Sequence, residues 1–279
     1  MYLSPLPLLA DDSEAREAFD LARAHCTSCR SYHGIWPYLR LTGRKRGVDA
    51  DRALLIPLLE RIIADGARNV FLAGSADPGV LSMVLAAAGG HALSTTVVDL
   101  CETPLATCRT FAARRCATIR TLAACLSEQR FRGEHDLVVA HSVLSFIPVP
   151  LLSDVVANFA DTLVPGGRLV LTGGFSVPRT HPPAFCDVVL EGLAARGIDL
   201  PTDEGEFRAL LAGYVENRVQ RYNHFATADE LLAFLVTHGF SIESVVSQAR
   251  GTSVDGTGKV IERSNPGVVV VARRSNAAR

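Results

Sequence analysis

The sequence predicts a doubly wound α/β fold, in which a mostly parallel sheet is covered by helices on both faces and ends in an antiparallel C-terminal hairpin. In the middle of the chain, short apolar runs alternate with helix-like segments. The runs lack strict apolar–polar alternation, which is typical of strands that are buried on both faces. Near the C-terminus, two strand-like segments follow one another with no helix between them, as in a hairpin.

The core elements follow from local patterns. The strands are expected at residues 69–73, 95–100, 119–122, 136–140 and 168–172. The helices between them are expected at residues 80–88, 104–115 and 151–163. Pro104 fits the first turn of its helix, where the missing N–H would have no partner within the helix. Pro165, Gly166 and Gly167 form a turn into the last of these strands.

The C-terminal part has its own signals. Thr227 and Glu230 have the spacing of a capping box, and Gly239 follows as a stop, which predicts a helix between them. Strands are expected at 240–246 and 268–272, joined by a polar, glycine-rich stretch.

Two segments lie outside this core. Residues 1–60 are predicted to form an N-terminal helical cap, and residues 61–279 the core. The core carries an insertion at about 176–226, which is longer than an ordinary loop. Because open α/β sheets bind ligands at the carboxyl ends of their strands, we expect the cap and this helical lid to close over that edge.

Composition excludes several classes of protein. Of 279 residues, 48% are hydrophobic and 20% are charged, which excludes a disordered chain. The 28 basic and 29 acidic residues give a net charge of −1, so nucleic-acid binding through bulk electrostatics is not expected. A small-molecule partner remains by elimination, and the oligomeric state is left open.

No targeting or membrane segment is expected. Residues 1–10 are apolar but contain Pro5 and Pro7 and lack a basic start, unlike a signal peptide. No apolar run approaches the roughly 20 residues of a membrane-spanning helix. The seven cysteines are an odd number and lie mostly in regular segments, which indicates reduced thiols and a cytoplasmic protein.

A glycine turn follows the first core strand. Gly74, Ala76 and Gly79 have the spacing of a dinucleotide fingerprint, but Ala76 replaces the glycine that lets a pyrophosphate approach. Asp77 adds a negative charge where a phosphate would bind. The turn therefore favours a cofactor with a positive centre and no phosphate, and a plain strand-to-helix turn is the alternative. The candidate cofactor-binding residues here are Gly74, Ser75, Ala76, Asp77 and Gly79.

Asp99 ends the next strand, 20 residues beyond Gly79. An acid at this point can accept hydrogen bonds from both hydroxyls of an adenosine ribose. The alternative role is that of a helix cap.

These motifs, in this order, resemble the class I S-adenosylmethionine-dependent methyltransferases over roughly residues 65–175 and 227–273. The resemblance is carried by the turn at 70–79, by Val97-Val98-Asp99-Leu100, by 136–144 with Phe146-Ile147-Pro148 after it, and by 163–171. It implies a seven-stranded sheet with an antiparallel last strand, and S-adenosyl-L-methionine as the cofactor.

The resemblance also assigns roles to matching positions. Gly74 and Gly79 would shape the loop beside the methionine part of the cofactor, Asp99 would hold the ribose, and Leu100 would pack near the adenine. His141 and Ser142, at the end of the fourth strand, would face the sulfonium and the substrate.

The chain departs from the family at three places. Leu72 replaces the usual acid two residues before the first glycine, and Ala76 replaces the middle glycine. The acid often found near the adenine amine is missing, and Cys125 and Ser127 occupy that neighbourhood. Adenine recognition would then use backbone groups or Ser127.

His141 is the candidate general base. Methyl transfer from a sulfonium is an in-line displacement that needs alignment, and a base only where the acceptor must lose a proton. An imidazole can accept that proton near neutral pH. The alternative is a histidine that merely lines the pocket wall.

The densest cluster of functional side chains lies at residues 26–40. Cys26, Cys29 and His33 could supply three zinc ligands, but no second C-x₂-C and no downstream Cys/His pair completes a site, so no metal is predicted. An N-terminal helix whose aromatic side chains pack on the sheet is one alternative. The preferred hypothesis is a cap over the cofactor, with Tyr32 and His33 as catalytic candidates and Arg40 or Tyr32 reaching the cofactor carboxylate or the substrate.

The insertion adds aromatic and basic groups. Tyr214, Arg218, Arg221 and Tyr222 are expected on one helical face, with His224 after them, and this face would favour an anionic small substrate if it is functional. A solvated helix face is the alternative.

The predicted function is therefore methyl transfer from S-adenosyl-L-methionine to an oxygen or nitrogen of a small molecule. One alternative is a different reaction of the same cofactor, such as cyclisation, elimination or aminocarboxypropyl transfer. Another is a non-catalytic binding protein that kept the fold and lost the cofactor.

Overall fold

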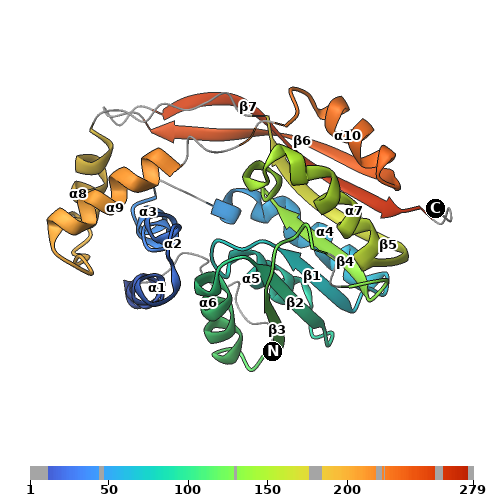
Figure 1. The fold of residues 1–279 in the computed structure, drawn as a ribbon, viewed down its shortest axis with the longest axis horizontal. Coiled ribbons are helices and arrows are strands. Elements are labelled where there is room, and N and C mark those ends of the chain that lie inside the picture. Colours follow the sequence, from blue (N-terminus) through green and yellow to red (C-terminus); the bar gives the residue numbers. More distant parts are fainter. Residues whose placement is uncertain are drawn as a thin grey trace.

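A seven-stranded sheet forms the centre of the computed structural model, which describes residues 12–43, 47–128, 131–175, 184–217, 222, 224–254 and 260–275 (Figure 1). The strand order is β3-β2-β1-β4-β5-β7-β6, with β1 to β5 parallel and β7 antiparallel to both its neighbours. The strands are β1 (Asn69–Ala73), β2 (Ser94–Asp99), β3 (Ile119–Ala123), β4 (His135–His141), β5 (Leu163–Gly174), β6 (Phe240–Val254) and β7 (Val260–Arg274). This confirms the predicted fold class.

Both faces of the sheet are buried, and successive residues of a strand enter different cores. Val70 and Leu72 of β1 pack into one core, whereas Phe71 and Ala73 pack into the other. The first core is covered by α4 (Arg52–Ala64), α5 (Gly79–Ala87) and α6 (Glu102–Ala113), and the second by α7 (Leu152–Thr162) and α10 (Ala228–Thr237). A buried Val or Leu contributes about 1.5–3 kcal/mol whichever face it points to, which explains the unbroken apolar runs.

The cap and the insertion share a third core. Helices α1 (Asp12–His25), α2 (Arg30–His33) and α3 (Trp36–Leu41) pack against α8 (Phe185–Ala194) and α9 (Glu204–Asn217). Figure 1 shows these helices together as a lobe beside α6. Phe19 and Tyr38 from the first group and Phe207 and Tyr214 from the second are fully buried in it. Two segments far apart in the sequence therefore form one unit.

The C-terminal hairpin is longer than the sequence indicates. β7 pairs with β5 only from Gly267 to Arg273, yet its pairing with β6 continues to Val260 opposite Val254. Among the described residues, this outer part of each strand pairs only with the other strand, and such backbone pairing needs no apolar pattern. Thr227 caps α10 as predicted, because its hydroxyl accepts a hydrogen bond from the Glu230 N–H at 3.2 Å.

The chain after α9 differs from the helix that the sequence predicts there. Arg218 and Arg221 lie outside the described residues. The described part of α9 ends at Asn217 and Tyr222 is not helical, so the prediction that Tyr222 shares a helical face with Tyr214 is wrong. Among the described residues, no helix is long and apolar enough to cross a bilayer.

Candidate functional site

The strand order reverses between β1 and β4, and the loops at the carboxyl ends of these strands diverge there. Gly74 follows β1 with a φ of +72°, in the left-handed region. A Cβ at Gly74 would lie 2.6 Å from Cγ2 of Val143, which follows β4. Glycine is thus required both by the backbone conformation and by the close approach of the two loops.

Asp99 is held at the end of β2 by two backbone amides. Its Oδ2 accepts from the Ser75 N–H and its Oδ1 from the Cys101 N–H, each at 2.8 Å. Burial raises the pKa of Asp99, and these two hydrogen bonds oppose the shift. Each carboxylate oxygen keeps a second lone pair that can accept a hydroxyl. Leu100, next to it, is 74% exposed and offers an apolar surface.

Cys125 and Ser127 lie on the neighbouring loop, after β3. The Ala124 N–H donates to the Asp99 carbonyl at 3.0 Å and fixes this loop beside the end of β2. Cys125 Sγ and Ser127 Oγ are 3.0 Å apart. Both residues therefore border the region next to Leu100.

Asp77 is neutralised by the cap. Its Oδ2 accepts from Trp36 Nε1 at 2.8 Å and forms an ion pair with Arg40, and its Oδ1 accepts from the Gly79 N–H at 2.7 Å at the start of α5. Arg40 is buried and also pairs with Asp49 at 2.6 Å. Its guanidinium binds two carboxylates of the protein, and this geometry does not favour the expected reach to a cofactor carboxylate.

His141 is paired with an acid that the sequence analysis missed. His141 Nε2 lies 2.8 Å from Oδ2 of Asp51, which ends the 3₁₀ helix η1 (Gly47–Asp51). Asp51 is buried, and its only sequence signal is a polar residue just before a helix. Ser142 follows with a φ of +56°, an uncommon conformation that is held by its N–H bond to the Thr172 carbonyl at 2.9 Å.

Aromatic side chains from three segments meet above this edge. The ring of Tyr32 stacks on Trp36 and on Tyr214, with centroids 5.6 and 5.9 Å away, and meets Phe146 edge-on at 5.7 Å. His224 Nε2 lies 3.0 Å from the Leu144 carbonyl, so the segment after α9 also contacts the loop after β4. Cap, insertion and strand-end loop are thereby joined.

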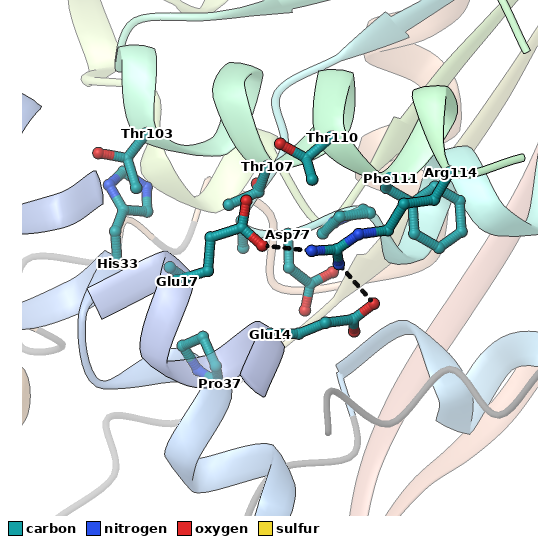
Figure 2. A pocket seen from close by; sticks show the side chains of 13 residues that line it. Glu14, Glu17, His33, Pro37, Asp77, Thr103, Thr107, Thr110, Phe111 and Arg114 are labelled. Carbon is teal, nitrogen blue, oxygen red and sulfur yellow. Dashed lines mark hydrogen bonds and ion pairs between the residues drawn. The ribbon is translucent and has the colours of Figure 1, made fainter. Parts of the chain in front are cut away.

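A pocket opens beside the glycine turn, between α1 and α6 (Figure 2). Glu14 and Glu17 pair with Arg114 across it, at 3.5 and 2.8 Å. Its lining consists of Glu14, Glu17, Ala18, His33, Pro37, Ala76, Asp77, Pro78, Thr103, Thr107, Thr110, Phe111 and Arg114. Ala76 and Asp77 of the glycine turn line this pocket, whereas Asp99 and His141 do not, so the pocket meets the strand-end site at the turn.

The structure thus gathers most of the predicted residues. The turn residues, Asp99 and Leu100 lie on one side of the site, and His141 and Ser142 lie at the end of β4. His33 instead faces a group of cysteines, with Nδ1 3.4 Å from Cys26 Sγ.

Solved structures provide the comparison, since no protein-family profile and no curated protein matches the chain. The Burkholderia thailandensis 1,6-didemethyltoxoflavin-N1-methyltransferase, solved with its substrate and S-adenosylhomocysteine, is 17% identical with a TM-score of 0.54, covering 97% of this chain and 93% of that one. A Methanosarcina mazei S-adenosylmethionine-dependent methyltransferase is 20% identical with a TM-score of 0.52, covering 78% and 97%. Magnesium protoporphyrin IX methyltransferase from Synechocystis, with bound S-adenosylhomocysteine, is 17% identical with a TM-score of 0.50, covering 95% and 100%.

The chain therefore has the class I S-adenosylmethionine-dependent methyltransferase fold. Its structural neighbours include enzymes of this class that act on small molecules.

Proposed function

We propose that this protein binds S-adenosyl-L-methionine at the carboxyl ends of β1, β2 and β4 and transfers the methyl group to an oxygen or nitrogen of a small molecule. The observation that carries the proposal is the position of Asp99, which two backbone amides hold at the end of β2 beside the glycine turn.

The residues at this edge fit such a cofactor. Asp99 would accept the ribose hydroxyls, and the exposed Leu100 would pack against the adenine. Asp77 is already paired with Arg40 and Trp36, so its charge would not repel the cofactor carboxylate. The Cβ of Ala76 is tolerable because this cofactor carries no phosphate.

His141 would act as the base where the acceptor must lose a proton. If Nε2–H donates to Asp51, Nδ1 is left as the proton acceptor, and Asp51 stabilises the imidazolium that forms. The bound cofactor supplies the methyl group. We leave His33 out of the chemistry because it faces the cysteines, and we assign Tyr32 to the wall of the substrate site.

The substrate site would lie under the aromatic cluster. Phe146 and Tyr222 are partly exposed there, at 43% and 37%, which favours a planar acceptor that stacks on aromatic rings. The anionic substrate expected from Arg218 and Arg221 stays a prediction.

Calorimetry with S-adenosyl-L-methionine and S-adenosylhomocysteine tests the cofactor proposal. We expect binding of one equivalent, and Asp99→Asn should weaken it about 10- to 100-fold because charged hydrogen bonds to the ribose are lost. Asp154→Asn, an exposed acid on α7, is the matched control and should bind normally. If the wild-type protein binds neither compound, both methyl transfer and the other reactions of S-adenosyl-L-methionine are excluded. A non-catalytic binding protein that has lost the cofactor would then be favoured.

The product identifies the reaction. Incubation with candidate planar acceptors should release S-adenosylhomocysteine together with a methylated acceptor. Release of methylthioadenosine would instead select cyclisation, elimination or aminocarboxypropyl transfer.

A further inference from the structure

We propose that Cys26, Cys29, His33 and Cys101 bind one zinc ion, which fastens the N-terminal cap to the start of α6. The candidate ligand atoms all lie within 4.8 Å of one another. Cys26 follows α1, Cys29 and His33 lie at the two ends of α2, and Cys101 lies between β2 and α6. The proposal is independent of the proposed methyl transfer.

The spacing of the four atoms fits a tetrahedral ion. Cys26 Sγ lies 3.4 Å from both His33 Nδ1 and Cys101 Sγ, and Cys29 Sγ lies 3.5 Å from Cys101 Sγ. Zinc bonds of about 2.3 Å to sulfur and about 2.0 Å to nitrogen separate the ligand atoms of a tetrahedron by roughly 3.5–3.8 Å. Small side-chain rotations would therefore place all four around a central ion.

The donor set points to zinc and to a structural role. Three cysteines and one histidine form a common closed zinc site, and Cys26 and Cys29 have the C-x₂-C spacing of such sites. All four positions are filled by the protein, so no position is open for substrate. A disulfide would use two of the sulfurs and leave the convergence of the third and of the imidazole without a purpose.

The surroundings favour a bound cation. Three sulfur atoms and one imidazole nitrogen meet here, and the thiolate is the form in which a cysteine binds a metal. Thr103 Oγ1 lies 3.1 Å from Cys26 Sγ and donates a hydrogen bond to the Leu21 carbonyl at 3.3 Å, so it holds this cluster against the end of α1. In Figure 2 His33 and Thr103 face one another at the end of the pocket.

The position of the fourth ligand in the sequence explains why no metal is predicted from local motifs. Cys101 lies 72 residues after Cys29, in another element and without a partner motif around it. Only the fold brings it to the cap. It also lies next to the cofactor site, because its own N–H holds Asp99. The ion would thus connect the cap to the residue assigned to the ribose.

Metal content tests the proposal directly. The full-length protein, purified without metal-affinity steps or chelators, should contain about one zinc per chain by mass spectrometry of the elements. Cobalt added to the metal-free protein should give thiolate charge-transfer bands and the visible bands of a tetrahedral site. Cys101→Ser should lose most of the zinc affinity, whereas Cys116→Ser, at an exposed cysteine, should keep it.

Three results would overturn the proposal: wild-type protein that takes up neither zinc nor cobalt, a Cys101→Ser protein that keeps a full equivalent, or a disulfide between two of these cysteines in protein purified under reducing conditions. If Cys101→Ser fails to fold, titration of metal-free wild-type protein with zinc decides, since one equivalent with release of protons is expected. Metal content is measured without reference to activity, so failure of the methyltransferase proposal would leave it standing.

Discussion

At the scale of single residues, the contact between Asp51 and His141 joins the N-terminal segment to the end of β4. The side chains are 2.8 Å apart and both are largely buried, with 3% and 12% of their surface exposed. A buried carboxylate beside one ring nitrogen fixes the tautomer of a neutral imidazole. This pair can therefore present the other nitrogen, Nδ1, to a substrate.

The tautomer of His141 can be measured without a substrate. Nitrogen NMR of labelled protein should show Nε2 protonated and Nδ1 bare, because Nε2 faces Asp51. Asp51→Asn should disturb this tautomer and, once an acceptor is known, reduce kcat about 10²- to 10⁴-fold with little change in cofactor affinity. Asp154→Asn serves as the control. Protonation at Nδ1 in the wild type would contradict the assignment of His141 as the base.

His135 makes stability depend on pH. It is buried on β4, and its Nε2 lies 3.3 Å from Thr96 Oγ1. Its imidazole contacts the rings of Phe71 and Phe131 edge-on. Burial lowers the pKa of His135 in the folded protein. Below the ordinary histidine pKa of about 6.5 the unfolded chain binds a proton that the folded chain does not, so stability is lost as the pH falls.

Urea unfolding between pH 7.5 and 5.5 checks this prediction. The free energy of unfolding should decrease less with falling pH in His135→Phe than in the wild type. One titrating group can contribute a slope of up to about 1.4 kcal/mol per pH unit. His91→Gln, at an exposed histidine, should leave the slope unchanged. Identical slopes in the wild type and His135→Phe would show that other groups cause the dependence.

At the scale of elements, the turn from β1 into α5 depends on Gly74. An alanine there would adopt an unfavourable φ of +72° and place its Cβ 2.6 Å from Val143. We expect Gly74→Ala to destabilise the protein by about 1–4 kcal/mol and to weaken cofactor binding. Gly173→Ala is the matched control, because nothing lies within 4 Å of a Cβ at that position. Equal unfolding free energies for the two variants would contradict the prediction.

The elements differ in how well the sequence predicts them. Core strands such as β1 and β4 are buried on both faces and leave a continuous apolar signal, and Thr227 marks its helix by a local bond. The outer part of the β6–β7 hairpin has no such signal, and its described residues are held by backbone pairing between the two strands. Local sequence patterns therefore predict those elements whose formation depends on residues close together in the sequence.

The candidate site divides in the same way. The positions of Gly74 and Asp99 at strand ends are predictable, because the apolar strands before them and the spacing of the glycines are visible in the sequence. The pairings of Asp51 with His141 and of Arg40 with Asp77 join segments far apart in the sequence, and no local pattern indicates them. The position of Cys101 beside Cys26, Cys29 and His33 is not predictable from the sequence for the same reason.

At the scale of the whole molecule, the helical lobe is fastened to the sheet near the proposed cofactor site. Arg40 and Trp36 bind Asp77 of the glycine turn, and the cysteine–histidine cluster reaches the loop after β2. Helices α1 to α3 share one core with α8 and α9. Loss of the contacts at either fastening point should therefore loosen the insertion as well as the cap.

Removing the proposed zinc tests this connection. Chelator-treated protein should exchange backbone hydrogens faster in α1–α3 and also in α8–α9, because a lobe that is freed at one end opens as a unit. The central strands β1 and β4 should exchange as slowly as before, since their two cores do not include the lobe. Affinity for S-adenosyl-L-methionine should fall about 10-fold, equal to about 1.4 kcal/mol, because Cys101 no longer holds Asp99 firmly.

Cys116→Ser protein should respond to the chelator as the wild type does, and adding zinc back should restore slow exchange. Faster exchange confined to α2, or spread evenly over the sheet, would mean that the lobe is not a single unit fastened at this point.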